Sequence, residues 1–124
     1  MKTSSDFMAE ANAVVPRLTA QEAIEKYKAG GGVFVDVRDS GAIAKSGTIA
    51  GAHRIARGMM EFVADPATSY HNNALQKDAE IYLVCGAGGQ AALAGKTLID
   101  MGFTNVTNIG GFADWKDAGG AIED

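Results

Sequence analysis

The sequence predicts a single α/β domain with a mainly parallel central sheet flanked by helices. Two short runs, residues 33–37 and 81–84, are rich in β-branched residues and nearly apolar throughout, which is typical of strands buried on both faces of a sheet. Helical patterns lie before and after these runs, and alternating strands and helices favour the α/β class. With 124 residues, 47% of them apolar, the chain is large enough for one hydrophobic core.

The composition excludes several classes of function. The formal net charge is −4 and no cluster of Lys and Arg occurs, so a nucleic-acid partner is not expected. Residues 1–6 lead into a mixed segment, so we expect no signal peptide, no membrane anchor and a cytoplasmic location. The single cysteine, Cys85, excludes an internal disulfide and a multi-cysteine zinc site, and His53 and His71 form no metal-binding motif. We expect neither a metal nor a cofactor.

The first helical segment is predicted to be a packing arm. Ser5 is the expected N-cap of a helix that starts at Asp6 and ends before Pro16. Residues 1–17 then form an N-terminal helical arm, and residues 18–124 form the domain.

The start of the domain carries clear helix and loop signals. Thr19 and Glu22 form a capping box that opens a helix through about Lys28, and residues 30–32, all glycine, end it. After the first strand, residues 58–80 contain Asp-Pro and Asn-Asn pairs and are predicted to be the least regular stretch, a loop over one end of the sheet.

The second half of the domain continues the alternation of strands and helices. After the strand at 81–84 the pattern predicts a helix from Gln90 to Met101, a strand at 105–108 and a short final helix at 111–116. The aromatic residues Phe103, Phe112 and Trp115 are expected to pack in the core.

Cys85 follows directly on the strand at 81–84, at its carboxyl end, where open α/β sheets bind ligands. The segment after it, Gly-Ala-Gly-Gly-Gln-Ala, is a glycine-rich turn into a helix, and such a turn points backbone N–H groups inward at an anion. These groups favour a thiolate over a thiol. Without a second cysteine, a covalent intermediate at Cys85 is more naturally a persulfide, whose terminal sulfur the glycines leave room for.

Three other interpretations of this loop remain. In the first interpretation, Cys85 is a buried structural residue beside an ordinary tight turn. The pattern G-x-G-x-x-A between a strand and a helix indicates a dinucleotide site, although no Asp or Glu follows the next strand. A cysteine phosphatase or arsenate reductase needs an arginine to clamp the oxyanion, and the two positions that could supply it are Gln90 and Ala91.

Several motifs, in one order along the chain, resemble those of the single-domain rhodanese-like sulfurtransferases. The likeness runs from about Leu18 to Glu123. Its landmarks are residues 35–39 (Val-Asp-Val-Arg-Asp), 47–52 (Gly-Thr-Ile-Ala-Gly-Ala), the Arg57-Gly58-Met59 turn with Glu61-Phe62 and Asp65-Pro66, the cysteine loop, Gly110-Gly111-Phe112 and Trp115.

The resemblance implies a three-layer rhodanese-like fold, with Cys85 as the catalytic cysteine and residues 85–90 as the active-site loop. It also implies transfer of sulfane sulfur from thiosulfate or a persulfide to a thiophilic acceptor such as cyanide, a thiol or a protein. The chain departs from the family at Gln90, where thiosulfate-using members commonly have Arg, and at Thr48 and Ala50, where His and Pro are usual.

The missing loop cation has two consequences for function. A charge-assisted hydrogen bond is about twice as strong as a neutral one, which predicts that thiosulfate is used roughly ten- to a hundredfold less well. The alternative function is a catalytically weak or inactive rhodanese-like module with a binding or regulatory role.

Six loop residues and one distant arginine are the candidate substrate-binding residues. The loop residues are Gly86, Ala87, Gly88, Gly89, Gln90 and Ala91. Arg57 lies in the family's Arg-Gly turn and is the best remaining cation at the mouth of the site.

Two charged residues and three large apolar ones have a predicted role outside the loop. Asp36 and Arg38 flank Val37, so they share one side of the strand end; they either support the loop or form a structural ion pair. Met59, Met60 and Phe62 are expected to anchor the irregular segment rather than to line a pocket.

Overall fold

The computed structural model describes all 124 residues and has a four-stranded parallel sheet at its centre. The strands lie in the order β3 (His53–Arg54), β1 (Val33–Asp36), β4 (Ile81–Cys85) and β5 (Val106–Gly111), and every pairing among them is parallel. Beyond β5, Arg17 pairs with Asn108 in a parallel bridge that extends this edge of the sheet. The predicted parallel sheet is confirmed.

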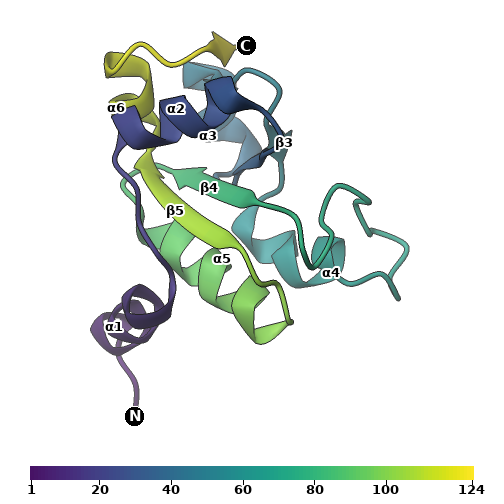
Figure 1. Cartoon of the computed structure of the whole chain (residues 1–124). Coiled ribbons are helices and arrows are strands. Elements are labelled where there is room, and N and C mark those ends of the chain that lie inside the picture. The colour runs from purple at the N-terminus through teal and green to yellow at the C-terminus, as the bar shows by residue number, and fades with distance from the viewer.

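Helices cover both faces of the sheet and complete three layers (Figure 1). One layer holds α2 (Ala20–Ala29), α3 (Ser40–Ser46) and α6 (Phe112–Asp117), and the other holds α4 (Met60–Ala64) and α5 (Gly89–Asp100). The short 3-10 helix η1 (Arg57–Met59) precedes α4, α1 (Ser4–Val14) packs against α5, and β2 (Thr48–Ile49) pairs antiparallel with β6 (Ile122–Glu123). None of the helices has the length and apolar character needed to cross a membrane.

The central strands are buried on both faces, and the two faces differ in chemistry. Val35 and Leu83 belong to a mainly aliphatic cluster against α4 and α5, whereas Phe34 and Tyr82 belong to an aromatic cluster that includes Trp115 of α6. The rings of Phe34 and Tyr82 stack with their centroids 4.8 Å apart. Because successive side chains of a strand point to opposite faces, this double burial requires the nearly continuous apolar runs seen in the sequence.

The segment 58–80 is more regular at its start than predicted. Residues 57–64 form η1 and α4, because Met60 and Ala64, one helical turn apart, are both buried in the aliphatic cluster. Met60 therefore anchors the segment as predicted, and the half-exposed ring of Phe62 packs edge-on against Tyr70 within the segment, whereas Met59 is exposed. Residues 65–80 contain only turns and bends.

Helix boundaries agree with the sequence at α2 and differ at α1. The capping box of α2 is confirmed: the Thr19 hydroxyl accepts from the Glu22 amide at 3.2 Å and the Glu22 carboxylate accepts from the Thr19 amide at 2.9 Å. At α1 the predicted cap Ser5 is wrong, because Thr3 makes the same reciprocal pair with Asp6. A Thr with an acidic residue three positions later satisfies two amides at once, which Ser5 with Met8 cannot do.

The segment that follows α1 packs closely against α5 at Gly95, which has no side chain. Ala11 and Val15 are buried, and a Cβ atom on Gly95 of α5 would lie only 2.9 Å from Cγ1 of Val15. The missing side chain at position 95 thus lets the chain run close to α5. From there the chain passes along β5, so that Arg17 arrives at the edge of the sheet next to the cysteine loop.

Candidate active site

Cys85 is the last residue of β4 and is 1% exposed. Its Sγ atom accepts hydrogen bonds from the backbone amides of Gly88 at 2.9 Å and Ala91 at 3.3 Å. Backbone N–H groups bind an anionic acceptor more strongly than a neutral one. The loop therefore surrounds the sulfur with donors that stabilise a thiolate or a sulfur anion attached to it.

Two glycines make this loop geometry possible. Gly88 has φ +100°, a left-handed conformation that side chains disfavour, and it is the N-cap residue of α5. Gly111, at the end of β5, lies against the carbonyl oxygen of Gly86, where a Cβ atom would overlap with it. The loop is thus curled over the end of β5, with Gly86 and Ala87 exposed at its tip.

Asn108 of β5 holds the cysteine loop through hydrogen bonds of its side chain. The sequence does not predict it as a site residue. Its Nδ2 donates to the carbonyl oxygen of Gly88 at 2.9 Å and its Oδ1 accepts from the amide of Gly110 at 2.8 Å. The side chain is 1% exposed, so these bonds cannot be replaced by bonds to solvent. The available signal in the sequence is a lone amide in a buried strand, two residues before a Gly-Gly pair.

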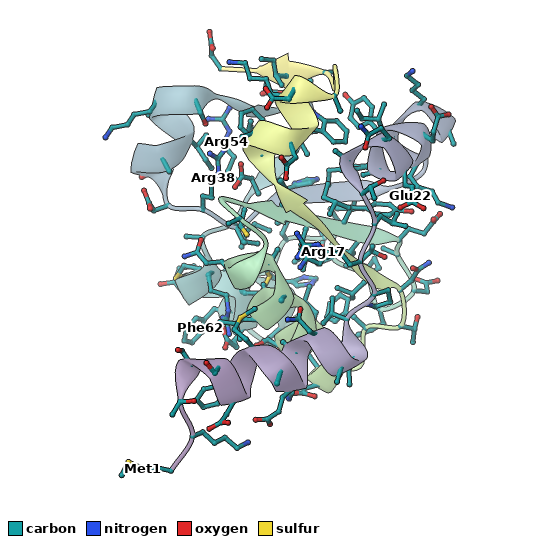
Figure 2. The ribbon with its side chains drawn as sticks, turned by 90° about the vertical axis from the view of Figure 1, so that its left-hand side faces the viewer. Met1, Arg17, Glu22, Arg38, Arg54 and Phe62 are labelled. Atoms are coloured by element: carbon teal, nitrogen blue, oxygen red, sulfur yellow. The ribbon has the colours of Figure 1, made fainter.

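Arg17 is a second residue that the sequence does not associate with the site. Its guanidinium group lies against two glycines: a Cβ on Gly88 would be 2.8 Å from both Nη1 and Nη2, and a Cβ on Gly110 would be 3.1 Å from Nη2. The backbone around it is paired with Asn108, through bonds from Leu18 N to Asn108 O and from Asn108 N to Pro16 O. Figure 2 shows Arg17 directed toward the start of α5. No local motif marks this residue, since the contact depends on how the N-terminal segment crosses the sheet edge.

Asp36 and Arg38 share one side of the strand end, as predicted, and form a buried ion pair of 2.7 Å. Arg38 also donates to Ser46 Oγ at 2.9 Å and to Gly47 O at 2.9 Å, and Thr48 Oγ1 donates to Asp36 at 2.8 Å. These partners lie at the end of α3 and in β2, not in residues 85–91. The pair therefore joins β1 to the segment after α3, and its support of the cysteine loop remains a prediction.

Arg57 is directed to the flank of α5. Its Nη1 donates to Glu61 at 3.1 Å and its Nη2 to Thr97 Oγ1 at 2.9 Å. Arg57 also lines a cavity of about 520 Å³, together with Phe7 of α1 and Leu93 of α5. Both of its hydrogen-bonding nitrogens are thus engaged away from the thiol, and a role in substrate binding remains a prediction.

The remaining loop positions differ in exposure. Gln90 is exposed in the first turn of α5, whereas Ala91 is buried and takes part through its amide. Thr48, which stands where related sequences usually have His, is fully buried behind Asp36.

Comparison with known proteins points to one family. The model of the Rhodanese-like domain matches residues 19–118. A thiosulfate sulfurtransferase, GlpE of Pseudomonas putida F1, is 35% identical over 101 residues, covering 81% of this chain and 84% of that protein. The adenylyltransferase and sulfurtransferase UBA4 of Candida albicans is 46% identical over 55 residues, covering 44% of this chain and only 13% of UBA4.

Solved structures agree with this result. A Rhodopseudomonas palustris protein of unknown function, described as a possible tyrosine phosphatase, has a TM-score of 0.91 and 40% identity, covering 99% of this chain and 96% of its own. The polysulfide-sulfur transferase homodimer of Wolinella succinogenes has a TM-score of 0.75 and 25% identity, covering 94% and 84%. By its sequence, its three-layer fold and its relatives, the chain belongs to the family of rhodanese-like domains.

Proposed function

We propose that this chain is a sulfurtransferase that carries sulfane sulfur as a persulfide on Cys85. The observation that carries the proposal is the pair of backbone amides, from Gly88 and Ala91, that donate to Sγ. Such donors stabilise the attacking thiolate and the persulfide anion that replaces it. The names of the relatives, which include thiosulfate and polysulfide sulfurtransferases, support the same class of reaction.

The proposed reaction has two displacement steps. In the first, the Cys85 thiolate attacks the outer sulfur of the donor, the S–S bond of the donor breaks, and the remainder leaves with the electron pair. The leaving group is sulfite when thiosulfate is the donor and a thiolate when a persulfide is the donor. In the second step an acceptor thiolate attacks the terminal sulfur of the Cys85 persulfide, whose S–S bond breaks and returns its electron pair to Sγ.

Thiosulfate is expected to be a poor donor for this chain. Gln90 supplies no charge, both polar arms of Arg57 bind Glu61 and Thr97, and Arg38 is paired with Asp36. The leaving sulfite dianion then relies on loop amides alone, whereas a low-molecular-weight persulfide releases a thiolate, which has a single negative charge at the leaving sulfur. We therefore propose persulfides as the preferred donors and a thiol, on a small molecule or a protein, as the acceptor.

A phosphatase function is not favoured by this loop. Recognition of a tetrahedral phosphoryl group needs a guanidinium fork beside the nucleophile, and positions 90 and 91 are Gln and Ala. The guanidinium of Arg17 lies on the α-carbon side of Gly88, whereas the amide of Gly88 faces Sγ. Arg17 thus approaches the loop from outside.

Mass spectrometry of the intact protein tests the proposal. After incubation with thiosulfate or glutathione persulfide, Cys85 is expected to gain the mass of one sulfur atom, and dithiothreitol is expected to remove it. The Cys85→Ser variant is the matched control because it keeps the size of the side chain and the loop. If no adduct forms from either donor in folded protein, the proposal is wrong and the binding or regulatory alternative stands.

That alternative has its own discriminating result. A module kept for binding retains its cellular function when Cys85 is replaced by Ser. Loss of function in this variant, at unchanged thermal stability, excludes the binding-only role.

A further inference from the structure

The guanidinium of Arg17 stands behind the cysteine loop without a counter-charge. Both terminal nitrogens of its side chain come equally close to Gly88, because a Cβ atom at that position would lie 2.8 Å from both Nη1 and Nη2. The other arginines of the chain each pair with a carboxylate, whereas no ion pair of the chain includes Arg17. The reaction as proposed above does not use this charge.

The extended segment between α1 and α2 sets the direction of this side chain. The backbone bonds on both sides of Arg17 go to one residue of β5, Asn108. Alternate residues of an extended segment face the same side, so Arg17 points toward α5 as Val15 does. Val15 packs at Gly95 of α5. Arg17 meets Gly88, two helical turns earlier along α5. The backbone therefore directs the guanidinium to the start of this helix.

A single residue, Gly88, separates this charge from the sulfur of Cys85. The amide of Gly88 donates to Sγ at 2.9 Å, so ordinary bond lengths place the terminal nitrogens of Arg17 within about 9 Å of Sγ. This separation is less than the screening length of about 10 Å in 0.1 M salt. Residues 86–91 carry no charged side chain of their own. The guanidinium does not touch the sulfur, but its positive potential extends to it.

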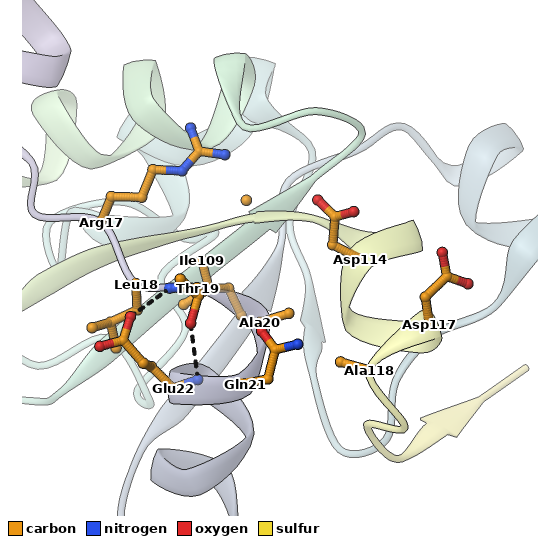
Figure 3. Close-up of a pocket in the computed structure, with 11 residues that line it drawn as sticks. Arg17, Leu18, Thr19, Ala20, Gln21, Glu22, Ile109, Asp114, Asp117 and Ala118 are labelled. Atoms are coloured by element: carbon orange, nitrogen blue, oxygen red, sulfur yellow. Dashed lines mark hydrogen bonds between the residues drawn. The ribbon is translucent and has the colours of Figure 1, made fainter.

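The outer side of Arg17 faces a cavity of about 550 Å³ between the start of α2 and α6 (Figure 3). The carboxylates of this cavity belong to Glu22, Asp114 and Asp117. Figure 3 shows Glu22 turned to Thr19, with which it forms the capping box, and the guanidinium of Arg17 directed away from Glu22. The two aspartates lie across the cavity on α6. Arg17 is exposed on this side, so dissolved salt screens its charge.

We propose that Arg17 sets the charge preference of the site: acting from behind Gly88, its potential favours anionic sulfur donors over neutral ones at Cys85. For the donor, the inference rests on the proposed sulfurtransferase function. Arg17 lies outside residues 19–118, which match the family model, so this charge comes from the N-terminal segment. The expected gain is about two- to fivefold for each negative charge on the reagent. This is less than an arginine within the loop would give, because Arg17 makes no direct contact.

The rates at which Cys85 reacts with a charged and a neutral alkylating agent measure this potential. Iodoacetate carries a carboxylate and iodoacetamide is neutral, and in both reactions the thiolate displaces iodide, which leaves with the electron pair. Because both reagents react with the same thiolate, the ratio of their rate constants does not depend on how much thiolate is present. Arg17→Gln is expected to lower the ratio of iodoacetate to iodoacetamide about two- to fivefold at an ionic strength of about 10 mM.

Salt and a conservative variant separate the charge from a change in the shape of the loop. In 1 M salt the screening length is about 3 Å, so the ratios of the wild type and Arg17→Gln are expected to converge. Arg17→Lys keeps the charge and is expected to keep most of the ratio. Lys28→Gln removes an exposed charge at the end of α2, before the start of β1, and is the matched control. Equal ratios in the wild type and Arg17→Gln at low salt overturn the inference, as does a difference that persists in 1 M salt.

The alkylation assay keeps this inference separate from the proposed function, because it uses the free thiol and needs no sulfur transfer. With thiosulfate as the donor, Arg17→Gln is expected to slow persulfide formation by a larger factor than alkylation by iodoacetate, since thiosulfate carries two negative charges. Failure to form the persulfide contradicts the proposed function and leaves the alkylation ratio as the test of Arg17. Persulfide formation with an unchanged alkylation ratio contradicts the role of Arg17 alone.

Discussion

The carboxyl ends of β1 and β4 lie side by side at the same edge of the sheet, but they differ in their charged side chains and in their exposure. At the end of β1, Asp36 and Arg38 form a buried ion pair, and Ser46, Gly47 and Thr48 satisfy their remaining polar atoms. At the end of β4, Cys85 is surrounded by glycines, and its sulfur is bound only by backbone amides. One strand end is rich in charge and closed, and the other has no side-chain charge and is open at its tip.

The difference shows which charges can serve a substrate. Charges that are buried and mutually satisfied hold the chain together but are not free to bind a ligand, because a new partner would have to replace an existing one. At the cysteine loop the donors are main-chain N–H groups, which point at the sulfur whatever the side chains are. The cysteine loop itself supplies no charged side chain, and the guanidinium of Arg17 contacts it only from the outer side of Gly88.

The largest expected effect on stability comes from breaking the buried ion pair at the end of β1. Asp36→Asn leaves the guanidinium of Arg38, 10% exposed at its side chain, without a counter-charge, and breaking a buried pair in this way typically costs about 3–5 kcal/mol. Urea denaturation measures the loss. The matched control is Glu61→Gln, which breaks the exposed Arg57–Glu61 pair and is expected to cost less than about 1 kcal/mol. Equal losses in the two variants would contradict the conclusion that burial makes the Asp36–Arg38 pair costly to break.

A smaller effect on stability is expected from removing the side-chain hydrogen bonds that hold the cysteine loop at the end of β4. Asn108→Ala removes the bonds to Gly88 and Gly110; the Gly88 carbonyl keeps its bond from the Ala92 amide, whereas the buried Gly110 amide loses its partner, which costs about 1–3 kcal/mol. The same variant is expected to slow alkylation of Cys85 by iodoacetamide at neutral pH, because the loop amides are no longer fixed on the thiolate. Asn105→Ala, on an exposed residue before β5, is the control. A loss of stability with unchanged alkylation would mean that Asn108 does not position the loop.

Adding a charge to the open end gives an effect of similar or smaller size. Gln90→Arg places a guanidinium in the first turn of α5 and is expected to raise kcat/KM for thiosulfate about ten- to a hundredfold, equivalent to roughly 1.4–2.8 kcal/mol. Steady-state formation of thiocyanate from thiosulfate and cyanide measures it. Gln76→Arg adds the same charge far from the loop and controls for net charge. No gain from Gln90→Arg would show that the open end lacks more than a cation.

The smallest expected effect is the pH dependence of stability that arises from Tyr82 of β4. Burial raises the pKa of Tyr82 to about 12, with a further contribution from its hydrogen bond to Glu80. Because this folded-state pKa lies above the ordinary tyrosine value of 10.0, the unfolded chain loses the proton first as the pH rises. Stability is then fully retained below about pH 10 and falls by about 1 kcal/mol by about pH 11.

Urea denaturation across this range, compared between the wild type and Tyr82→Phe, checks the expectation. The Phe variant has no titrating group at this position, so its stability should depend less on pH. An identical pH dependence in both proteins would show that Tyr82 is not the titrating group.

Local patterns account for the elements that local forces build. The runs at 33–37 and 81–84 are strands because only a doubly buried strand needs such continuous apolar sequence, and the Thr19–Glu22 capping box starts α2 because both groups lie within one turn. The cap of α1 was misplaced by two residues because Ser5 and Thr3 are both acceptable caps locally. The reciprocal bond with Asp6 distinguishes them.

Long-range contacts account for what the local patterns miss. α4 forms because Met60 and Ala64 find room in a core built by β1, β4 and α5, which residues 58–64 alone do not reveal. Arg57 donates to Glu61 and Thr97, which the local sequence does not reveal, and its predicted role in substrate binding remains a prediction.

The sequence by itself determined the α/β architecture, the two central strands and the position of the single thiol in its glycine-rich turn, because each depends on the character of adjacent residues. Only the tertiary structure decided that Asn108 fixes the loop and that Arg17 stands beside it with Asp114 across a shared cavity. These contacts join residues far apart in the chain, and their geometry follows from how the N-terminal segment crosses β5. That crossing is set by packing of the whole domain, including the missing side chain at Gly95.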